Sequence, residues 1–217
     1  MVSRQTERDG GARVAPPDPW DPLVRLTHWI IVLAVLVNYA IVKPGGTVHV
    51  WVGWAVLAVL ALRFLWGLLG PKEARFSAFP PDPRAGMSHL LGLFRGKARE
   101  YPSHNPAGAL MVYTLWAALL ALVLTGLVMT DFKSPVTIAE EKAAVAAGDW
   151  SVLVAQGDAA QGDEDDGDGK IAKEIHEVAA NLILLLALLH VGGVLVEGRV
   201  LKRNLVRPMI HGGSRRR

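Results

Sequence analysis

Four long apolar stretches, separated by polar segments, dominate the pattern of the chain. They cover residues 24–42, 48–69, 107–130 and 171–197. Each approaches the ~20 residues that an α-helix needs to cross ~30 Å of hydrocarbon. Helices are expected because a backbone in lipid must satisfy its own hydrogen bonds, and nothing alternates with the period of two typical of a membrane barrel. The pattern predicts an all-α fold: an integral membrane four-helix bundle running up-down-up-down.

The composition agrees with a membrane protein. Hydrophobic residues make up 51% of the 217 residues and charged residues 20%, and the mean hydropathy is +0.29. The chain has no cysteine, which excludes disulfides, iron–sulfur clusters and covalently attached c-type haem. Glycine-rich nucleotide loops and hydrolase motifs are also missing, so nucleotide or hydrolase chemistry is not implied and no catalytic residue is predicted.

Charges in the connecting segments predict the orientation. With four crossings, both termini and the 71–107 loop share one face, which carries sixteen Lys and Arg against five on the other face. The positive-inside bias then places both termini in the cytoplasm of a bacterial plasma (inner) membrane. The long loop 131–175, with eleven acidic residues, would lie outside.

Three regions follow from this topology. Residues 1–19 are expected to be a disordered cytoplasmic tail, residues 20–210 the four-helix transmembrane domain, and residues 211–217 a basic tail. The first apolar stretch is not expected to be a signal peptide, since its upstream tail is long and neutral and no small-residue cleavage site follows it. The dispersed basic residues suit anionic headgroups of membrane lipid, and no nucleic-acid partner is expected.

The depth of the histidines is the most informative feature. Four of the seven lie within apolar stretches, at His28, His49, His176 and His190, where an ionisable side chain is costly and usually functional. His28 starts the first stretch near the inner face, and His49 starts the second near the outer face. The fourth stretch enters from outside, so His176 is outer and His190 inner. Fourteen residues separate them, roughly 21 Å of helical rise with a return to within about 40° of the same direction. The depths therefore predict two pairs, one inner and one outer.

Two imidazoles from facing helices can supply both axial ligands of a haem iron. Such an iron has no open position, so it transfers electrons, and two irons at different depths would form a path across the bilayer. Gly53, one helical turn after His49, would leave room for a flat macrocycle. Arg25 and Arg63, near the inner boundary, could pair with the haem propionates.

Other interpretations of these residues stay open. Each histidine alone could equally be a hydrogen-bonded structural residue, and both arginines could snorkel to lipid headgroups. A different class of function is a haem-free membrane subunit that relays protons or binds metal through its histidines. A zinc or copper site would need carboxylate or thiolate partners at the same depth, and only Glu174 and Glu177 near His176 qualify.

The remaining motifs are weaker. His104 precedes Asn105-Pro106, which is typical of a turn and helix start, and a structural role is expected. His89 belongs to a short amphipathic segment expected at the cytoplasmic interface. Residues 164–175 resemble part of a calcium loop, but Ile175 stands where a bidentate Glu belongs, so a solvated acidic loop is the better interpretation.

Several of these segments together form a specific signature. They are Trp20-Asp21-Pro22-Leu23-Val24-Arg25-Leu26-Thr27-His28-Trp29, His49 with Gly53, Arg63-Phe64-Leu65-Trp66-Gly67, Gly70-Pro71, Ala74-Arg75-Phe76, His104-Asn105-Pro106-Ala107-Gly108, His176-Glu177, His190 with Gly193-Val194, Asn204-Leu205-Val206, and Met209-Ile210. Over about residues 19–210, the chain resembles the bacterial cytochrome b561 and nickel-hydrogenase b-type cytochrome group.

The resemblance implies a four-helix membrane cytochrome with two b haems, and the family's ligands match His28, His49, His176 and His190. It also implies electron transport in a respiratory chain, between the quinone pool and a partner such as a c-type cytochrome or a hydrogenase. We therefore expect an electron-transfer subunit rather than a stand-alone enzyme, with quinone oxidoreductase activity as a narrower alternative. The acidic loop 131–175 departs from the family pattern and leaves the partner open.

Overall fold

A computed structural model describes residues 20–97, 99–101, 103–151 and 167–211. The N-terminal tail 1–19 and residues 212–217 of the basic tail lie outside the described residues. The central part of the acidic segment, 152–166, lies outside them as well.

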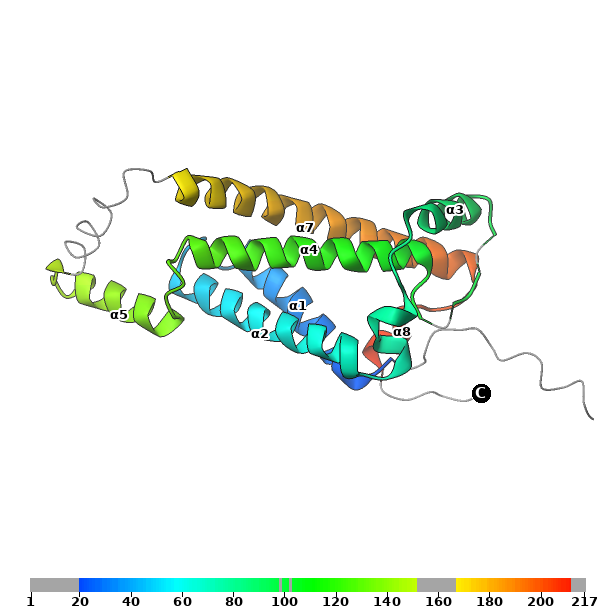
Figure 1. The fold of residues 1–217 in the computed structure, drawn as a ribbon, viewed down its shortest axis with the longest axis horizontal. Helices are drawn as coiled ribbons and strands as arrows, with labels where there is room; N and C mark the ends of the chain where they lie inside the picture. Colours follow the sequence, from blue (N-terminus) through cyan, green and yellow to red (C-terminus); the bar gives the residue numbers. More distant parts are fainter. Residues whose placement is uncertain (1–19, 98, 102, 152–166, 212–217) are drawn as a thin grey trace, which may run out of the picture. The chain divides into compact units, whose positions relative to one another are not determined.

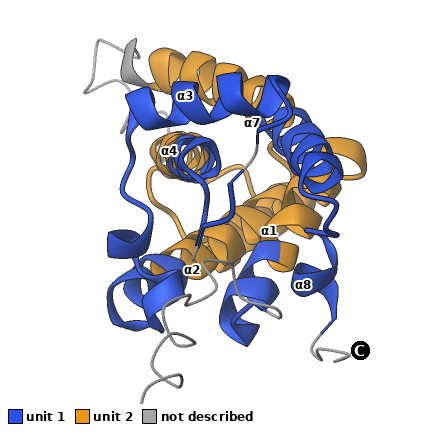
Figure 2. Ribbon diagram, turned by 90° about the vertical axis from the view of Figure 1, so that its right-hand side faces the viewer, with its two compact units in different colours: residues 1–28, 62–115, 186–217 blue, residues 29–61, 116–185 orange. Residues whose placement is uncertain are grey.

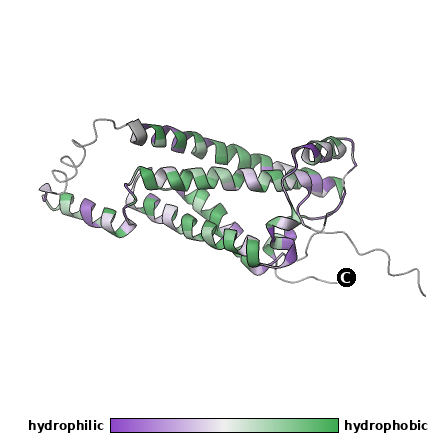
Figure 3. Ribbon diagram, in the orientation of Figure 1, coloured by the Kyte–Doolittle hydropathy of each residue, from purple (hydrophilic) through white to green (hydrophobic). Residues whose placement is uncertain are grey.

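The described residues form helices and no strand, and four of the helices are long (Figure 1). These are α1 (Pro22–Ala40), α2 (Thr47–Leu69), α4 (Pro106–Val128) and α7 (Gly167–Val200). Among the described residues, these four helices are the ones long and apolar enough to cross a membrane. Figure 3 shows hydrophobic residues along all four. The predicted all-α class with four spans is confirmed.

Large apolar side chains on these helices face outward. Leu33 is 62% exposed, Leu65 53% and Leu188 72%. In water such contiguous apolar surface would favour aggregation, whereas lipid tails are as apolar as the side chains themselves. The exposed faces are therefore those expected to contact hydrocarbon.

Two of the long helices begin with the same local device. At the start of α1, the Asp21 carboxylate accepts hydrogen bonds from the backbone N–H groups of Leu23 and Val24. At the start of α4, the Asn105 side-chain oxygen accepts from the Gly108 N–H at 2.7 Å. Each cap is followed by a proline at the first helical position, where a missing N–H costs nothing. The predicted turn and helix start at Asn105-Pro106 is confirmed.

The acidic segment differs from the sequence expectation because part of it is helical. Helix α5 spans Pro135–Ala146, and its N-cap Ser134 accepts a hydrogen bond from the Thr137 N–H. Alanine and glutamate in this segment are strong helix formers, and Ser-Pro is a good helix start. Acidic composition alone had predicted a loop over the whole of 131–175.

The chain divides into two compact units, coloured separately in Figure 2. Unit 1 comprises residues 1–28, 62–115 and 186–217, and unit 2 comprises residues 29–61 and 116–185. The four long helices contribute residues to both. The units are described below one at a time.

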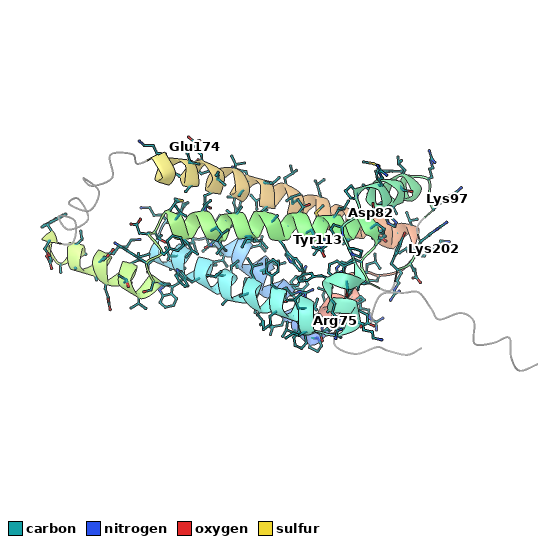
Figure 4. All side chains as sticks on the ribbon, viewed as in Figure 1. Arg75, Asp82, Lys97, Tyr113, Glu174 and Lys202 are labelled. Atoms are coloured by element: carbon teal, nitrogen blue, oxygen red, sulfur yellow. The ribbon has the colours of Figure 1, made fainter. Side chains whose placement is uncertain are left out.

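Unit 1 includes the end of α2 and the segment that follows it. Two short 3₁₀ helices, η1 (Lys72–Ala74) and η2 (Phe76–Ala78), follow α2. Arg75, labelled in Figure 4, donates from Nε to the Gly70 carbonyl at 2.6 Å. A Cβ on Gly67 would lie 2.4 Å from the Phe76 ring, so glycine is required for this close approach. The Phe76 ring also lies 6.2 Å from the Tyr113 ring of α4.

Unit 1 also holds α3 (Pro83–Phe94) and α8 (Arg207–Ile210). Asp82 caps α3, and Phe94 at its other end is 83% exposed. His89, in contrast, is buried at 8% exposure. The amphipathic character predicted for this segment is present, but its histidine faces the protein.

Unit 2 contains α5 and the turn that joins α1 to α2. Lys142 of α5 donates from Nζ to the Gly45 carbonyl of that turn at 3.0 Å. Lys133 and Glu141 form an ion pair at 2.8 Å. These contacts attach α5 to the helix ends beside which His49 and His176 lie.

Candidate functional site

In unit 1, the structure brings His28 of α1 and His190 of α7 together. Their ring centroids are 6.4 Å apart and their planes are inclined by 55°. Both side chains are half-buried. The two imidazoles come from different helices and face each other.

In unit 2, His49 of α2 and His176 of α7 form a second pair. Their ring centroids are 6.0 Å apart and their planes are inclined by 61°. The inner and outer pairs expected from the sequence are thus pairs of neighbouring rings.

The spacing of both pairs suits one metal ion held between two imidazoles. Each metal–nitrogen bond adds about 2 Å and each ring nitrogen lies about 1 Å from its ring centre, so trans rings are about 6 Å apart. The observed 6.4 Å and 6.0 Å agree with this distance. Within each pair, the two rings come from two different helices, so a planar group could lie between them.

Two residues of α4 contact the His176 ring. The Thr125 hydroxyl oxygen lies 2.9 Å from His176 Nδ1, and a Cβ built on Gly126 would lie 3.6 Å from His176 Cε1. The Gly126 contact is an ordinary van der Waals distance, so the small residue lets α4 approach the His176 ring closely. His49, the facing residue, has no such support: its Nδ1 is buried and has no hydrogen-bond partner among the described residues.

Gly53 has open space beside the pair in unit 2. A Cβ on this half-buried glycine, one turn after His49, would meet nothing within 4 Å. Gly192 and Gly193, which follow His190, also meet nothing within 4 Å, but both are exposed, so the space there is outside the helix. Of these three glycines, Gly53 is therefore the one whose surroundings suit a flat macrocycle beside a histidine.

Arg63 is buried in unit 1, at 6% exposure, and interacts electrostatically with Asp21. Arg25 is half-buried, and its Nε is buried with no hydrogen-bond partner among the described residues. A guanidinium that reaches lipid headgroups keeps its charged end exposed, so the burial of Arg63 near Asp21 argues against that role for Arg63.

His104 lies closer to the inner pair than its sequence motif had indicated. Its ring lies 5.1 Å from the Trp20 ring and 4.6 Å from the Phe79 ring. Burial, then the positive charge of Arg63, then His190 lower the pKa of His104 to about 4. His104 is therefore neutral at pH 7. Aromatic packing supports the structural role expected for it, and its proximity to His190 could not be seen in the motif.

A second cluster in unit 1 was not anticipated. Glu197, near the end of α7, accepts a hydrogen bond from the Asn105 side-chain amide at 2.5 Å. Its other oxygen lies 3.7 Å from His89 Nε2. In the sequence, Glu197 is a carboxylate at the end of an apolar stretch. That pattern is equally typical of a helix end that faces solvent, so it did not indicate this cluster.

The alternative metal sites find little support. Within the described ranges, no group of three or more His, Asp or Glu side chains is placed to hold a metal ion. In the calcium-loop motif, Asp168, Gly169 and Ile171 belong to helix α7, whereas Glu164 and Asp166 lie outside the described residues. The helical part lacks the loop conformation of such a site.

The family model described as prokaryotic cytochrome b561 matches residues 19–212. Neither curated proteins nor solved structures gave a match to the chain.

Proposed function

Because the chain belongs to the prokaryotic cytochrome b561 family, whose members transfer electrons across membranes with b-type haem, we propose that it is a di-haem electron-transfer subunit. His28 and His190 would hold the iron of an inner haem, and His49 and His176 that of an outer haem. The observation that carries this proposal is the presence of two imidazole pairs at the spacing of trans axial ligands.

A haem iron with two imidazole ligands exchanges one electron at a time between its ferric and ferrous forms. The protein supplies the ligands, the orientation and the surroundings. Arg25 and Arg63 would bind propionate groups of the inner haem, since a guanidinium matches a carboxylate in geometry and charge. Gly53 would leave space for the face of the outer haem.

The charge distribution of the loops and the family membership support the proposed orientation and the proposed classes of partner. We propose an inner-membrane protein with both termini in the cytoplasm, as the charge bias of its loops predicts. Electrons would pass between the quinone pool and a redox partner protein such as a c-type cytochrome or a hydrogenase. Family membership weighs against the haem-free alternative, in which the histidines relay protons or bind another metal.

The test is the haem content of the purified full-length protein. We expect two b haems per chain with the low-spin spectrum of bis-imidazole iron. His176→Ala should lose one haem, and His28→Ala should lose the other. Two haems retained in either variant, or fewer than two in the unmodified chain, would contradict the ligand assignment. Oxidation of an added quinol by the isolated protein would support the quinone version of the proposal.

A further inference from the structure

The contacts of Thr125 determine which nitrogen of His176 carries a proton. The Thr125 hydroxyl lies 2.6 Å from the Ala121 carbonyl oxygen of its own helix and 3.2 Å from that of Leu122. A hydroxyl has one hydrogen, and a carbonyl can only accept, so this hydrogen is donated within α4. Toward His176 the same oxygen is left as an acceptor.

Because the Thr125 oxygen is an acceptor toward the ring, the imidazole nitrogen beside it must be a donor. His176 Nδ1, 2.9 Å from the Thr125 oxygen, is therefore the nitrogen that bears hydrogen. The lone pair is then on Nε2, the nitrogen available to a metal ion.

The facing ligand lacks this arrangement. His49 Nδ1 is buried and has no hydrogen-bond partner among the described residues. Of the two imidazoles in unit 2, His176 is thus the one whose tautomer and ring orientation the protein sets. Hydrogen bonding at the distal nitrogen also makes an imidazole a more basic ligand.

We infer that Thr125 is a positioning residue for His176: it fixes the Nδ1–H tautomer, presents Nε2 to the iron of the outer haem, and strengthens the ligand. This inference rests on the proposed function, because it takes His176 to be a haem ligand. A more basic ligand stabilises ferric over ferrous iron, so Thr125 would lower the reduction potential of one haem and leave the other unchanged.

The experiment compares Thr125→Val, which replaces the hydroxyl by a methyl group, with Thr125→Ser, which keeps the hydroxyl. Thr114→Val is the matched control, because the Thr114 hydroxyl makes the same bond within α4, 2.8 Å to the Leu110 carbonyl, and is exposed. Each full-length protein would be purified in detergent. Its haem content would be measured, and its two midpoint potentials determined by spectroscopic redox titration.

For Thr125→Val we expect the midpoint potential of one haem to become more positive. The expected shift corresponds to a tenfold rise in the ferrous-to-ferric ratio at a given potential, which is about 59 mV for one electron. Thr125→Ser and Thr114→Val should titrate like the unmodified protein. If Thr125→Val loses one haem at unchanged helix content, reconstitution should show about 10–100-fold weaker haem binding, the usual cost of removing such a support. That result would also uphold the inference.

Two midpoints in Thr125→Val equal to those of the unmodified protein would overturn the inference. An equal shift of both midpoints would also overturn it, because that would reflect a general disturbance. His176→Ala distinguishes a failure of the proposed haem ligand from a failure of the proposed role of Thr125. If that variant keeps both haems, the proposed function fails. If it loses one haem while Thr125→Val behaves normally, only the role of Thr125 fails.

Discussion

His89 of α3 and Glu197 of α7 form a contact that joins a short peripheral helix to a long apolar one, with Nε2 3.7 Å from Oε1. Both side chains are largely buried, at 4% and 12% side-chain exposure. Asn105, which caps α4, donates to the same carboxylate. One carboxylate therefore connects three helices of unit 1.

Removing this carboxylate should loosen α3. Glu197→Ala removes the carboxylate beside His89 and leaves the Asn105 side-chain amide without its acceptor, at a cost of about 1–3 kcal/mol. We expect a lower melting temperature in detergent and faster tryptic cleavage at Arg95 and Lys97, just after α3. Glu100→Ala is the control, since Glu100 pairs with Arg203 at the surface at 41% exposure and should cost under about 1 kcal/mol. Cleavage of Glu197→Ala at the unmodified rate would refute this role.

Gly67 should tolerate no side chain. In Gly67→Ala the new methyl group would overlap the Phe76 ring, and such overpacking typically costs about 1–3 kcal/mol. Thermal unfolding of the purified protein would measure the loss. Gly67→Ala combined with Phe76→Leu should regain part of the lost stability, since leucine removes the overlapping ring. Additive losses in the double variant would show that the two residues are not coupled.

A substitution at Gly53 tests haem binding without disturbing the fold. A side chain there meets no atom of the chain within 4 Å, so Gly53→Leu should keep the helix content measured by circular dichroism. If the outer haem lies beside His49, the same variant should lose one haem per chain. Ala55→Leu, at an exposed position two residues further along α2, should keep both. Two haems in Gly53→Leu would place the macrocycle elsewhere.

His104 should make stability depend on pH. Its pKa is lowered from 6.5 to about 4 by burial first and then by Arg63 and His190, so the unfolded chain binds the proton more readily than the folded one. The stability that this neutral histidine contributes is present above pH 6.5 and is lost as pH falls toward 4, by an amount on the order of 1–3 kcal/mol. Melting temperatures between pH 7 and pH 4.5 would show it.

His104→Gln tests this contribution, because glutamine is polar but does not titrate. The melting temperature of the variant should fall less steeply with decreasing pH than that of the unmodified chain. Parallel slopes for His104→Gln and the unmodified protein would rule out a titrating His104.

The pattern of apolar residues was enough to predict the four spans, which the structure confirms, and a depth for each histidine, which stays a prediction. A bilayer of fixed thickness demands apolar runs of fixed length, and a helix converts residue count into depth at a constant rise. Those two regularities predicted the partners His28 with His190 and His49 with His176, whose rings the structure places side by side. Their binding of haem iron stays a prediction.

Which side chains support these rings became visible in the packed helices. Thr125 and His176 are 51 residues apart, and Glu197 and Asn105 are 92 apart, so no spacing along the chain relates them. Which atoms meet depends on how each helix is rotated about its axis and packed against its neighbour, to within a few tenths of an ångström. An along-chain pattern gives the depth of a residue in the membrane, whereas a hydrogen bond between helices requires the packed side chains themselves.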